Sequence, residues 1–214
     1  MGAGTGLGEC YLTCSSLRPR DGYECNASEG GHADYVPHSN LERELLDNLR
    51  EKFDEPNRVS VERVVSGRGL ANVYEFLAKK FPDKVDSKVD EDFHNAGDMK
   101  GRVVGVQANM EEGQGCQLCC MALDIFASAY GSEVGNAALK FLPTGGMFVS
   151  GGLTGKNLKF IEGKDGSFMK AYFDKGRVKC VLDNVPLFAV LDEGIGLNGA
   201  RIRAEREYKK LFSM

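Results

Sequence analysis

Glycine turns recur at the ends of three short segments with strand character, and this pattern limits the folds open to the chain. The 214 residues include 27 glycines. One turn, at residues 2–8, runs into a short strand; a second brackets the apolar residues 147–150; a third follows the apolar run 185–191. In α/β folds, a strand that ends in glycines before a helix is a place that receives nucleotides. The pattern therefore predicts an α/β fold with a ligand at the strand ends.

The first turn reads Gly-Ala-Gly-Thr-Gly-Leu-Gly and favours binding of an anion. Glycines at this density let successive backbone N–H groups converge, and the Thr5 hydroxyl can reach a phosphate oxygen. A dinucleotide fingerprint is excluded, because that motif follows a strand and opens a helix, whereas this turn starts the chain and leads into a strand. A Walker loop is excluded too, because the chain contains no Gly-Lys-Ser or Gly-Lys-Thr. A flexible N-terminal tail is the alternative interpretation.

A second candidate for ligand binding is the loop Ser-Glu-Gly-Gly-His-Ala-Asp at residues 28–34. It has no helical or strand periodicity, and it carries Glu29, His32 and Asp34 around two adjacent glycines. Their side chains place hydrogen-bond acceptors and a donor on a short arc that suits a polar ligand. Local chemistry alone favours a plain surface turn, because Gly and Asp are ordinary turn residues.

Amphipathic patterns predict the helices that support these loops. A capping box begins at Ser39, with Glu42 reaching back and apolar residues following to Phe53. Residues 115–142 indicate one long buried helix, or two helices separated near residues 130–131. Between these helices lies a β-branched run at 59–70, which contains Glu62. Its carboxylate is either solvent-facing on a strand or a positioned acceptor, and the spacing does not decide between the two.

Composition argues for small-molecule chemistry. The formal net charge is −4 and 42% of residues are hydrophobic, which allows a normal core without a basic stripe for nucleic acid or anionic membrane. No apolar run approaches the roughly 20 residues needed to cross a bilayer, and the chain does not open like a signal peptide. These features predict a cytoplasmic protein.

The seven cysteines are interpreted as structural residues. Cys116, Cys119 and Cys120 would be the sharpest zinc candidates, but no second cluster follows at finger-like spacing, so we expect buried thiols and no metal site.

Residues 83–101 are charged and follow a helix-breaking proline, so we expect a mobile surface excursion. His94 lies in it and is expected to be solvated.

Five motifs in sequence order resemble the glucokinases of the bacterial type, and the match extends over nearly the whole chain. The motifs are Gly-Ala-Gly-Thr-Gly-Leu-Gly at 2–8, Glu-Gly-Gly-His-Ala-Asp at 29–34, Glu-Arg-Val-Val-Ser-Gly at 62–67, Gly-Gly-Met-Phe-Val-Ser-Gly-Gly at 145–152 and Gly-Leu-Asn-Gly-Ala at 196–200. A related sugar-kinase group carries a zinc-binding cysteine cluster soon after the Glu and His pair, and no such cluster follows His32, so the zinc-free family is favoured.

The resemblance implies the actin-like, ribonuclease H-like ATPase fold, in which two α/β lobes close over ATP and substrate. Residues 1–214 are expected to be the larger C-terminal lobe, a mixed sheet flanked by helices, without the smaller N-terminal lobe. Matched to the family's motifs, Glu29, His32 and Glu62 are implied to bind glucose hydroxyls. Carboxylates suit this task because they accept hydrogen bonds from sugar hydroxyls.

The same resemblance implies the nucleotide site. Gly4, Thr5 and Gly6 match the second phosphate loop, and Gly151 with Gly152 match the adenosine-binding turn. The implied reaction is transfer of the γ-phosphoryl group of ATP to the 6-hydroxyl of glucose, with ATP and Mg²⁺ as cofactors. Glucose and ATP are the expected partners, and a homodimer is left open.

One departure from the family affects the expected activity. Members begin with a smaller lobe that carries an Asp-x-Gly-Gly-Thr phosphate loop and an Asn-Asp pair, whose aspartate is the base; neither motif is in this chain. We therefore expect a truncated chain with no catalytic residue of its own. The alternatives are a lobe that binds sugar or nucleotide without catalysis, and an unrelated glycine-rich enzyme such as a dehydrogenase.

Overall fold

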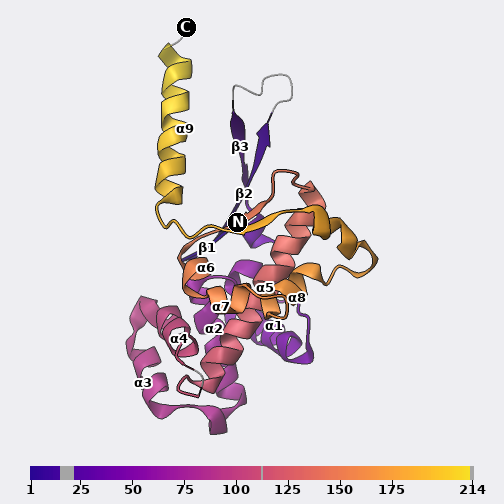
Figure 1. Ribbon diagram of the computed structural model, residues 1–214. Helices are drawn as coiled ribbons and strands as arrows, with labels where there is room; N and C mark the ends of the chain where they lie inside the picture. Colours follow the sequence, from indigo (N-terminus) through magenta and orange to yellow (C-terminus); the bar gives the residue numbers. More distant parts are fainter. Residues whose placement is uncertain (15–21, 112, 213–214) are drawn as a thin grey trace.

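A long central helix organises the molecule. The computed structural model describes residues 1–14, 22–111 and 113–212. In it, α5 (Gln117–Phe141) runs as one uninterrupted helix of 25 residues, with α8 (Ser167–Phe173), α2 (Gly67–Lys80) and α4 (Lys100–Ala108) packed around it (Figure 1). The predicted long buried helix is confirmed, without a break at residues 130–131. It is apolar nearly all round, as expected for a helix that is covered on several sides.

The strands form two small sheets that one bridge joins. β1 (Gly2–Ala3), β2 (Leu7–Cys14) and β3 (Tyr23–Ser28) are antiparallel in the order β1-β2-β3. β4 (Met147–Val149) and β5 (Leu187–Ala189) pair in parallel. A parallel bridge between Gly2 and Ser150 links β1 to the end of β4. The result is the mixed α/β arrangement that the sequence predicts, with helices around it.

Further helices complete the fold. The α-helices are α1 (Asn40–Phe53), α3 (Ser87–Asn95), α6 (Gly152–Lys156), α7 (Leu158–Ile161) and α9 (Ile195–Phe212); the short 3₁₀ turns are η2 (Gly30–His32), η3 (Val61–Arg63), η4 (Pro82–Lys84), η5 (Gly97–Met99) and η6 (Gly176–Asn184). No helix among the described residues is both long and apolar enough to cross a membrane.

The capping of α1 follows the prediction only in part. Ser39 Oγ accepts a hydrogen bond from the Glu42 backbone N–H at 3.2 Å. The Glu42 carboxylate does not return to Ser39; it accepts from the backbone N–H of His38 at 3.1 Å and from the Tyr35 hydroxyl at 2.9 Å. The side chain is buried, so these two donors keep its charge hydrogen-bonded.

The stretch 83–101 differs from the expected mobile excursion. It folds into η4, α3 and η5, and α3 buries Val89 and Phe93 against the core. The Phe93 ring lies 4.5 Å from that of Tyr74, centroid to centroid. Two apolar residues spaced by four give α3 a narrow apolar stripe, which the charged composition of the stretch obscured. His94 is exposed on the same helix, as predicted, with 62% of its side chain accessible.

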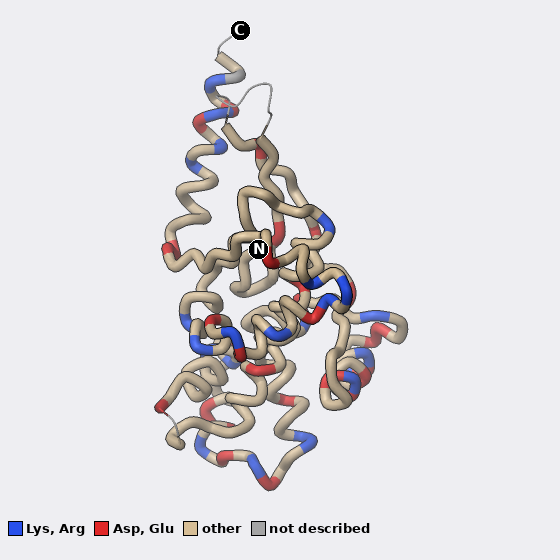
Figure 2. The backbone as a smooth tube through the Cα atoms, turned by 45° about the vertical axis from the view of Figure 1, so that its right-hand side comes forward, with Lys and Arg blue, Asp and Glu red and all other residues tan. Residues whose placement is uncertain are grey.

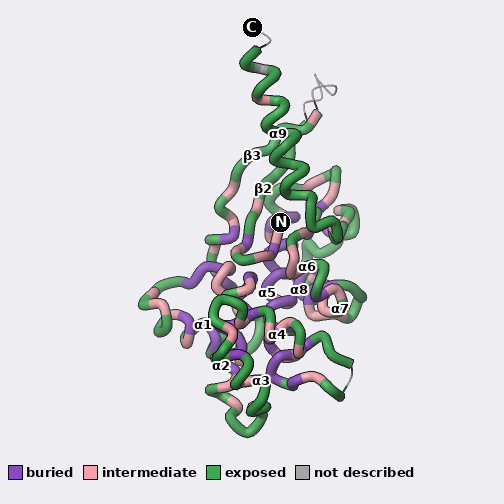
Figure 3. Tube along the Cα trace, turned by 90° about the vertical axis from the view of Figure 1, so that its left-hand side faces the viewer, coloured by how far each residue is buried: buried purple, intermediate pink, exposed green. Residues whose placement is uncertain are grey.

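One end of the molecule is markedly less buried than the rest. The β2–β3 hairpin and α9 extend away from the helical part, and both are largely exposed (Figures 1 and 3). Lys and Arg are interspersed with Asp and Glu along the chain, as Figure 2 shows. The buried core lies around α5 and α2, which are the elements that support the candidate site.

Candidate functional site

The glycine turn near the N-terminus is a tight hairpin. β1 and β2 pair with Ala3 opposite Leu7, and the Gly4 N–H donates to the Gly6 carbonyl oxygen at 2.9 Å. Thr5 lies at the tip of this hairpin and is exposed. The structure therefore presents the Thr5 hydroxyl and the neighbouring backbone on an accessible turn, as a phosphate-binding loop requires.

The second glycine turn lies beside the first. The Ala3 N–H donates to the Ser150 carbonyl oxygen at 3.0 Å, and Ser150 is followed by Gly151 and Gly152, where α6 begins. Gly151 has φ +92°, and a Cβ there would come within 2.3 Å of the Ala3 carbonyl oxygen. Because β1 and the end of β4 are parallel neighbours, their glycine turns emerge at the same edge.

Helix α2 is also anchored to the hairpin. Its first residue, Gly67, donates a backbone hydrogen bond to the Gly4 carbonyl oxygen at 2.8 Å. Ser66 is the N-cap and accepts from the Gly69 N–H at 2.8 Å, while its hydroxyl donates to the Glu62 carbonyl oxygen at 2.7 Å. These contacts fix the segment 62–67 against the glycine hairpin.

Glu62 connects the two sequence motifs directly. It lies on η3 and not on a strand, and its Oε2 accepts the Leu7 backbone N–H at 2.9 Å. Of the two interpretations left open by the sequence, the structure supports the positioned acceptor. The side chain is half-buried, and Oε1 makes no hydrogen bond with any described residue. One carboxylate oxygen is therefore engaged by the hairpin and the other is free for a ligand.

Glu29 and His32 lie where β3 leaves β2. Ser28, the last residue of β3, pairs with Glu9, and the chain then turns through η2. The carboxylate Oε2 of Glu29 and the imidazole Nε2 of His32 lie 3.8 Å apart, and their side chains are 90% and 57% exposed. Both groups face solvent and are accessible to a polar ligand.

The loop that carries Glu29 and His32 is tied to the segment that carries Glu62. Asp34 and Ser60 form an antiparallel bridge, and the Val61 N–H donates to the Ala33 carbonyl oxygen at 2.8 Å. Arg58 donates to Asp34 Oδ1 and to the His32 carbonyl oxygen, each at 2.8 Å. Asp34 thus has a structural role, because its carboxylate is held by Arg58.

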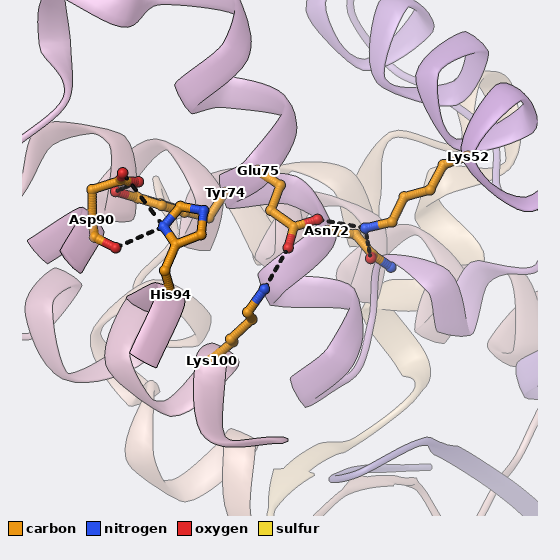
Figure 4. A network of polar contacts seen from close by, with 7 residues as sticks. All are labelled: Lys52, Asn72, Tyr74, Glu75, Asp90, His94 and Lys100. Atoms are coloured by element: carbon orange, nitrogen blue, oxygen red, sulfur yellow. Dashed lines mark hydrogen bonds and ion pairs between the residues drawn. The ribbon is translucent and has the colours of Figure 1, made fainter. Parts of the chain in front are cut away.

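A cavity of about 380 Å³ adjoins these motifs and is lined by Thr5 and Glu62. Glu75 also lines this cavity, and it accepts from Lys52 at 2.5 Å and from Lys100 at 3.0 Å (Figure 4). Burial pushes the pKa of Glu75 upward, but the hydrogen bonds from the two lysines outweigh it and hold the pKa below its ordinary value. Lys52, Glu75 and Lys100 lie on three different helices, α1, α2 and α4, so no local spacing in the sequence could have predicted these ion pairs.

The three cysteines near the start of α5 are largely shielded from solvent. Cys116 and Cys119 are buried and Cys120 is half-buried at the start of α5, which confirms the expectation of buried thiols there. Among the described residues, no three or more His, Cys, Asp or Glu side chains gather in a way that could hold a metal ion.

Comparison with known proteins agrees with this geometry. The chain is 39% identical to a glucokinase of Synechocystis sp. over 210 residues, covering 95% of this chain and 58% of that protein. A crystal structure of glucokinase from an Antarctic psychrotroph superposes with a TM-score of 0.68 at 26% identity, over 94% of this chain and 55% of that one. The chain therefore spans less than two thirds of the length of the relatives that it matches.

A more distant structure shows the same fold. A ROK-family glucokinase from Streptomyces griseus, solved with glucose and AMPPNP, matches with a TM-score of 0.59 at 19% identity, over 93% of this chain and 57% of that one. These structures place the chain in the actin-like ATPase fold of sugar kinases. The sequence model of the glucokinase family matches residues 1–207. The chain therefore belongs to the glucokinase family.

Proposed function

We propose that the chain forms the larger, C-terminal lobe of an ATP-dependent glucokinase, with all 214 residues in one domain. The enzyme transfers the γ-phosphoryl group of ATP to the 6-hydroxyl of glucose and gives glucose 6-phosphate. The observation that carries the proposal is the hydrogen bond between Glu62 Oε2 and the Leu7 N–H, because it joins the sugar motif to the phosphate hairpin. Kinases need this proximity, since positioning supplies most of the catalysis of phosphoryl transfer.

The sugar side of the site consists of Glu29, His32 and Glu62. Glucose is neutral and rich in hydroxyl groups, so carboxylates that accept hydrogen bonds are its natural partners. Glu62 Oε1 and the exposed carboxylate of Glu29 supply free acceptors, and His32 supplies a ring nitrogen. The glucose in the Streptomyces griseus structure supports this choice of ligand.

The nucleotide side consists of Gly4, Thr5 and Gly6 on the hairpin, with Gly151 and Gly152 beside it. Backbone N–H groups of the hairpin and the Thr5 hydroxyl are the donors proposed for the phosphate oxygens, and the second turn is the place proposed for the nucleoside. Mg²⁺ is expected to arrive with ATP, because this ion keeps much of its water and is held largely by phosphates.

The base that accepts the proton of the sugar hydroxyl is not assigned to any residue of this chain. The relatives are longer than the matched region, and the resemblance places the base in an Asn-Asp pair. We therefore propose that these 214 residues bind both ligands and that turnover needs the longer protein.

We also propose that the protein is cytoplasmic and forms a homodimer. Light scattering in solution tests the dimer.

Calorimetry tests the proposed function. The chain is titrated with glucose, with ATP and Mg²⁺, and with NADH, and formation of glucose 6-phosphate is followed in a coupled assay. We expect glucose and ATP to bind, Glu62→Gln to weaken glucose binding, and Glu51→Gln, an exposed carboxylate on α1, to change nothing. Failure to bind either ligand contradicts the proposal. Turnover by the chain alone contradicts the assignment of the base to a longer protein.

A further inference from the structure

The cavity beside the hairpin contains one cation that has no partner among the residues described by the structure. Four basic side chains line the cavity: Lys52, Arg63, Arg68 and Lys100. Both lysines are engaged by Glu75. Arg63 lies 3.6 Å from Glu55 Oε1 and stacks over the Phe53 ring at 4.0 Å, so it is engaged as well.

Arg68 makes no hydrogen bond or ion pair with any residue that the structure describes. It is exposed on the first turn of α2, and the backbone just before it is fixed, because the Gly67 N–H donates to the Gly4 carbonyl oxygen at 2.8 Å. Its position is therefore set relative to the hairpin that carries Thr5, while its guanidinium group is free. Unlike the other three cations, it has no contact within the described part of the chain that explains its charge.

We propose that Arg68 binds the phosphate oxygens of the nucleotide held by the glycine hairpin; this inference rests on the proposed function. A guanidinium group has a planar fork of donors that fits two phosphate oxygens, and it remains charged at every relevant pH. The other expected ligand, glucose, carries no charge for it to neutralise. A cation at the phosphates would also offset the charge on the oxygens of the transferred group.

Asp98 offers the main alternative partner for Arg68. It lines the same cavity and is exposed, and it also has no hydrogen-bond or ion-pair partner among the described residues. If the two side chains paired in solution, Arg68 would serve the structure and not the nucleotide. In that case Asp98→Asn would weaken nucleotide binding as much as removal of the arginine does.

Calorimetry on the 214-residue chain distinguishes these roles, with ATP, ADP and adenosine as probes. We expect Arg68→Gln to weaken ATP binding about tenfold and ADP binding less, and to leave adenosine binding unchanged. Arg68→Lys should retain part of the affinity, since it keeps the charge but loses the fork. Arg102→Gln is the matched control, because Arg102 is an exposed arginine on α4 that does not line the cavity and has no partner among the described residues.

Three results would overturn the inference. They are ATP binding that is unchanged in Arg68→Gln, an equal loss for ATP and adenosine, and an Asp98→Asn variant that loses ATP affinity in parallel. Each of these leaves the proposed function intact, because the unaltered chain still binds ATP. If the unaltered chain binds neither ATP nor adenosine, the proposed nucleotide site itself is wrong, and the role of Arg68 is wrong with it.

Discussion

The Glu62 carboxylate accepts the backbone N–H of Leu7 at 2.9 Å, although the two residues are 55 positions apart in the chain. Leu7 opens β2 at the glycine hairpin, and Glu62 belongs to the motif that resembles the sugar-binding motif of the family. One hydrogen bond thus couples the two halves of the candidate site. The affinity for sugar should depend on the hairpin, and the shape of the hairpin should depend on Glu62.

Gly6 provides the space for this hydrogen bond. A Cβ at Gly6 would come within 2.4 Å of Glu62 Oε2, so Gly6→Ala must displace the carboxylate from Leu7. We expect the free energy of unfolding to fall by about 1 kcal/mol and glucose to bind several-fold more weakly. Urea denaturation and calorimetry measure the two effects. Gly8→Ala is the control, since the nearest atom to its Cβ would be 3.9 Å away; equal behaviour of the two variants would refute the coupling.

Glu29 tests the sugar site independently of the hairpin. Its carboxylate is almost fully exposed, so Glu29→Gln should leave the melting temperature unchanged. Loss of a charge-assisted hydrogen bond should raise the Kd for glucose about tenfold in the chain, and raise KM for glucose in a longer active enzyme. ATP binding should not change. An unaltered glucose affinity would remove Glu29 from the site.

Gly151 is required by its backbone conformation as well as by space. Its φ of +92° is unfavourable for any side chain, and a Cβ would meet backbone atoms of Ala3 that cannot move aside. Gly151→Ala should cost about 2 to 3 kcal/mol of unfolding free energy. Gly155→Ala, inside α6 with no atom within 4 Å, should instead be neutral or slightly stabilising. Thermal unfolding of both variants measures this contrast, and similar losses in the two would contradict it.

Glu133 predicts a pH dependence of stability. Burial in α5 raises its pKa above the ordinary 4.5, and nearby Glu9 adds to the rise, which exceeds the opposing effects of Asn136, Lys140 and Lys175. The folded state therefore binds the proton more tightly than the unfolded state, so this group's contribution to stability falls as pH rises through and above 4.5.

Replacement of this carboxyl should reveal that contribution. Glu133→Gln removes the titration, so its melting temperature should exceed that of the unaltered chain at neutral pH. The difference should shrink as the pH falls below the ordinary glutamate value of 4.5. Calorimetric melting curves over this pH range measure it. A difference that stays constant with pH would show that Glu133 does not titrate in the expected way.

Phe93 tests whether residues 83–101 belong to the core. Its side chain is fully buried against Tyr74, so Phe93→Ala should cost about 3 to 5 kcal/mol. The neighbouring His94→Ala should change stability by less than about 0.5 kcal/mol, because His94 is exposed. Urea denaturation compares the two. A small effect of Phe93→Ala would restore the view of this stretch as a mobile excursion.

Features that depend on neighbours in the chain could be predicted from the sequence. The apolar periodicity of residues 115–142 gave the position of α5, and the Ser39 cap marked the start of α1. The first two glycine turns and the flanking strands were placed correctly because backbone freedom and apolar runs are local properties. The third predicted turn was wrong, because residues 195–200 form the first turns of α9. Prediction was weakest where a few apolar residues lie in a charged stretch, as at Val89 and Phe93.

The arrangement of the site was decided by tertiary structure. The sequence placed Glu62 among apolar neighbours without showing that it would accept from Leu7, and it gave no sign that Arg58 would hold Asp34. Lys52 and Lys100 meet on Glu75 only because α1, α2 and α4 pack together. Such contacts join residues 23 to 55 positions apart, and they depend on how helices and strands pack. The sequence by itself determined which residues could bind a ligand, and packing decided which of them share a site.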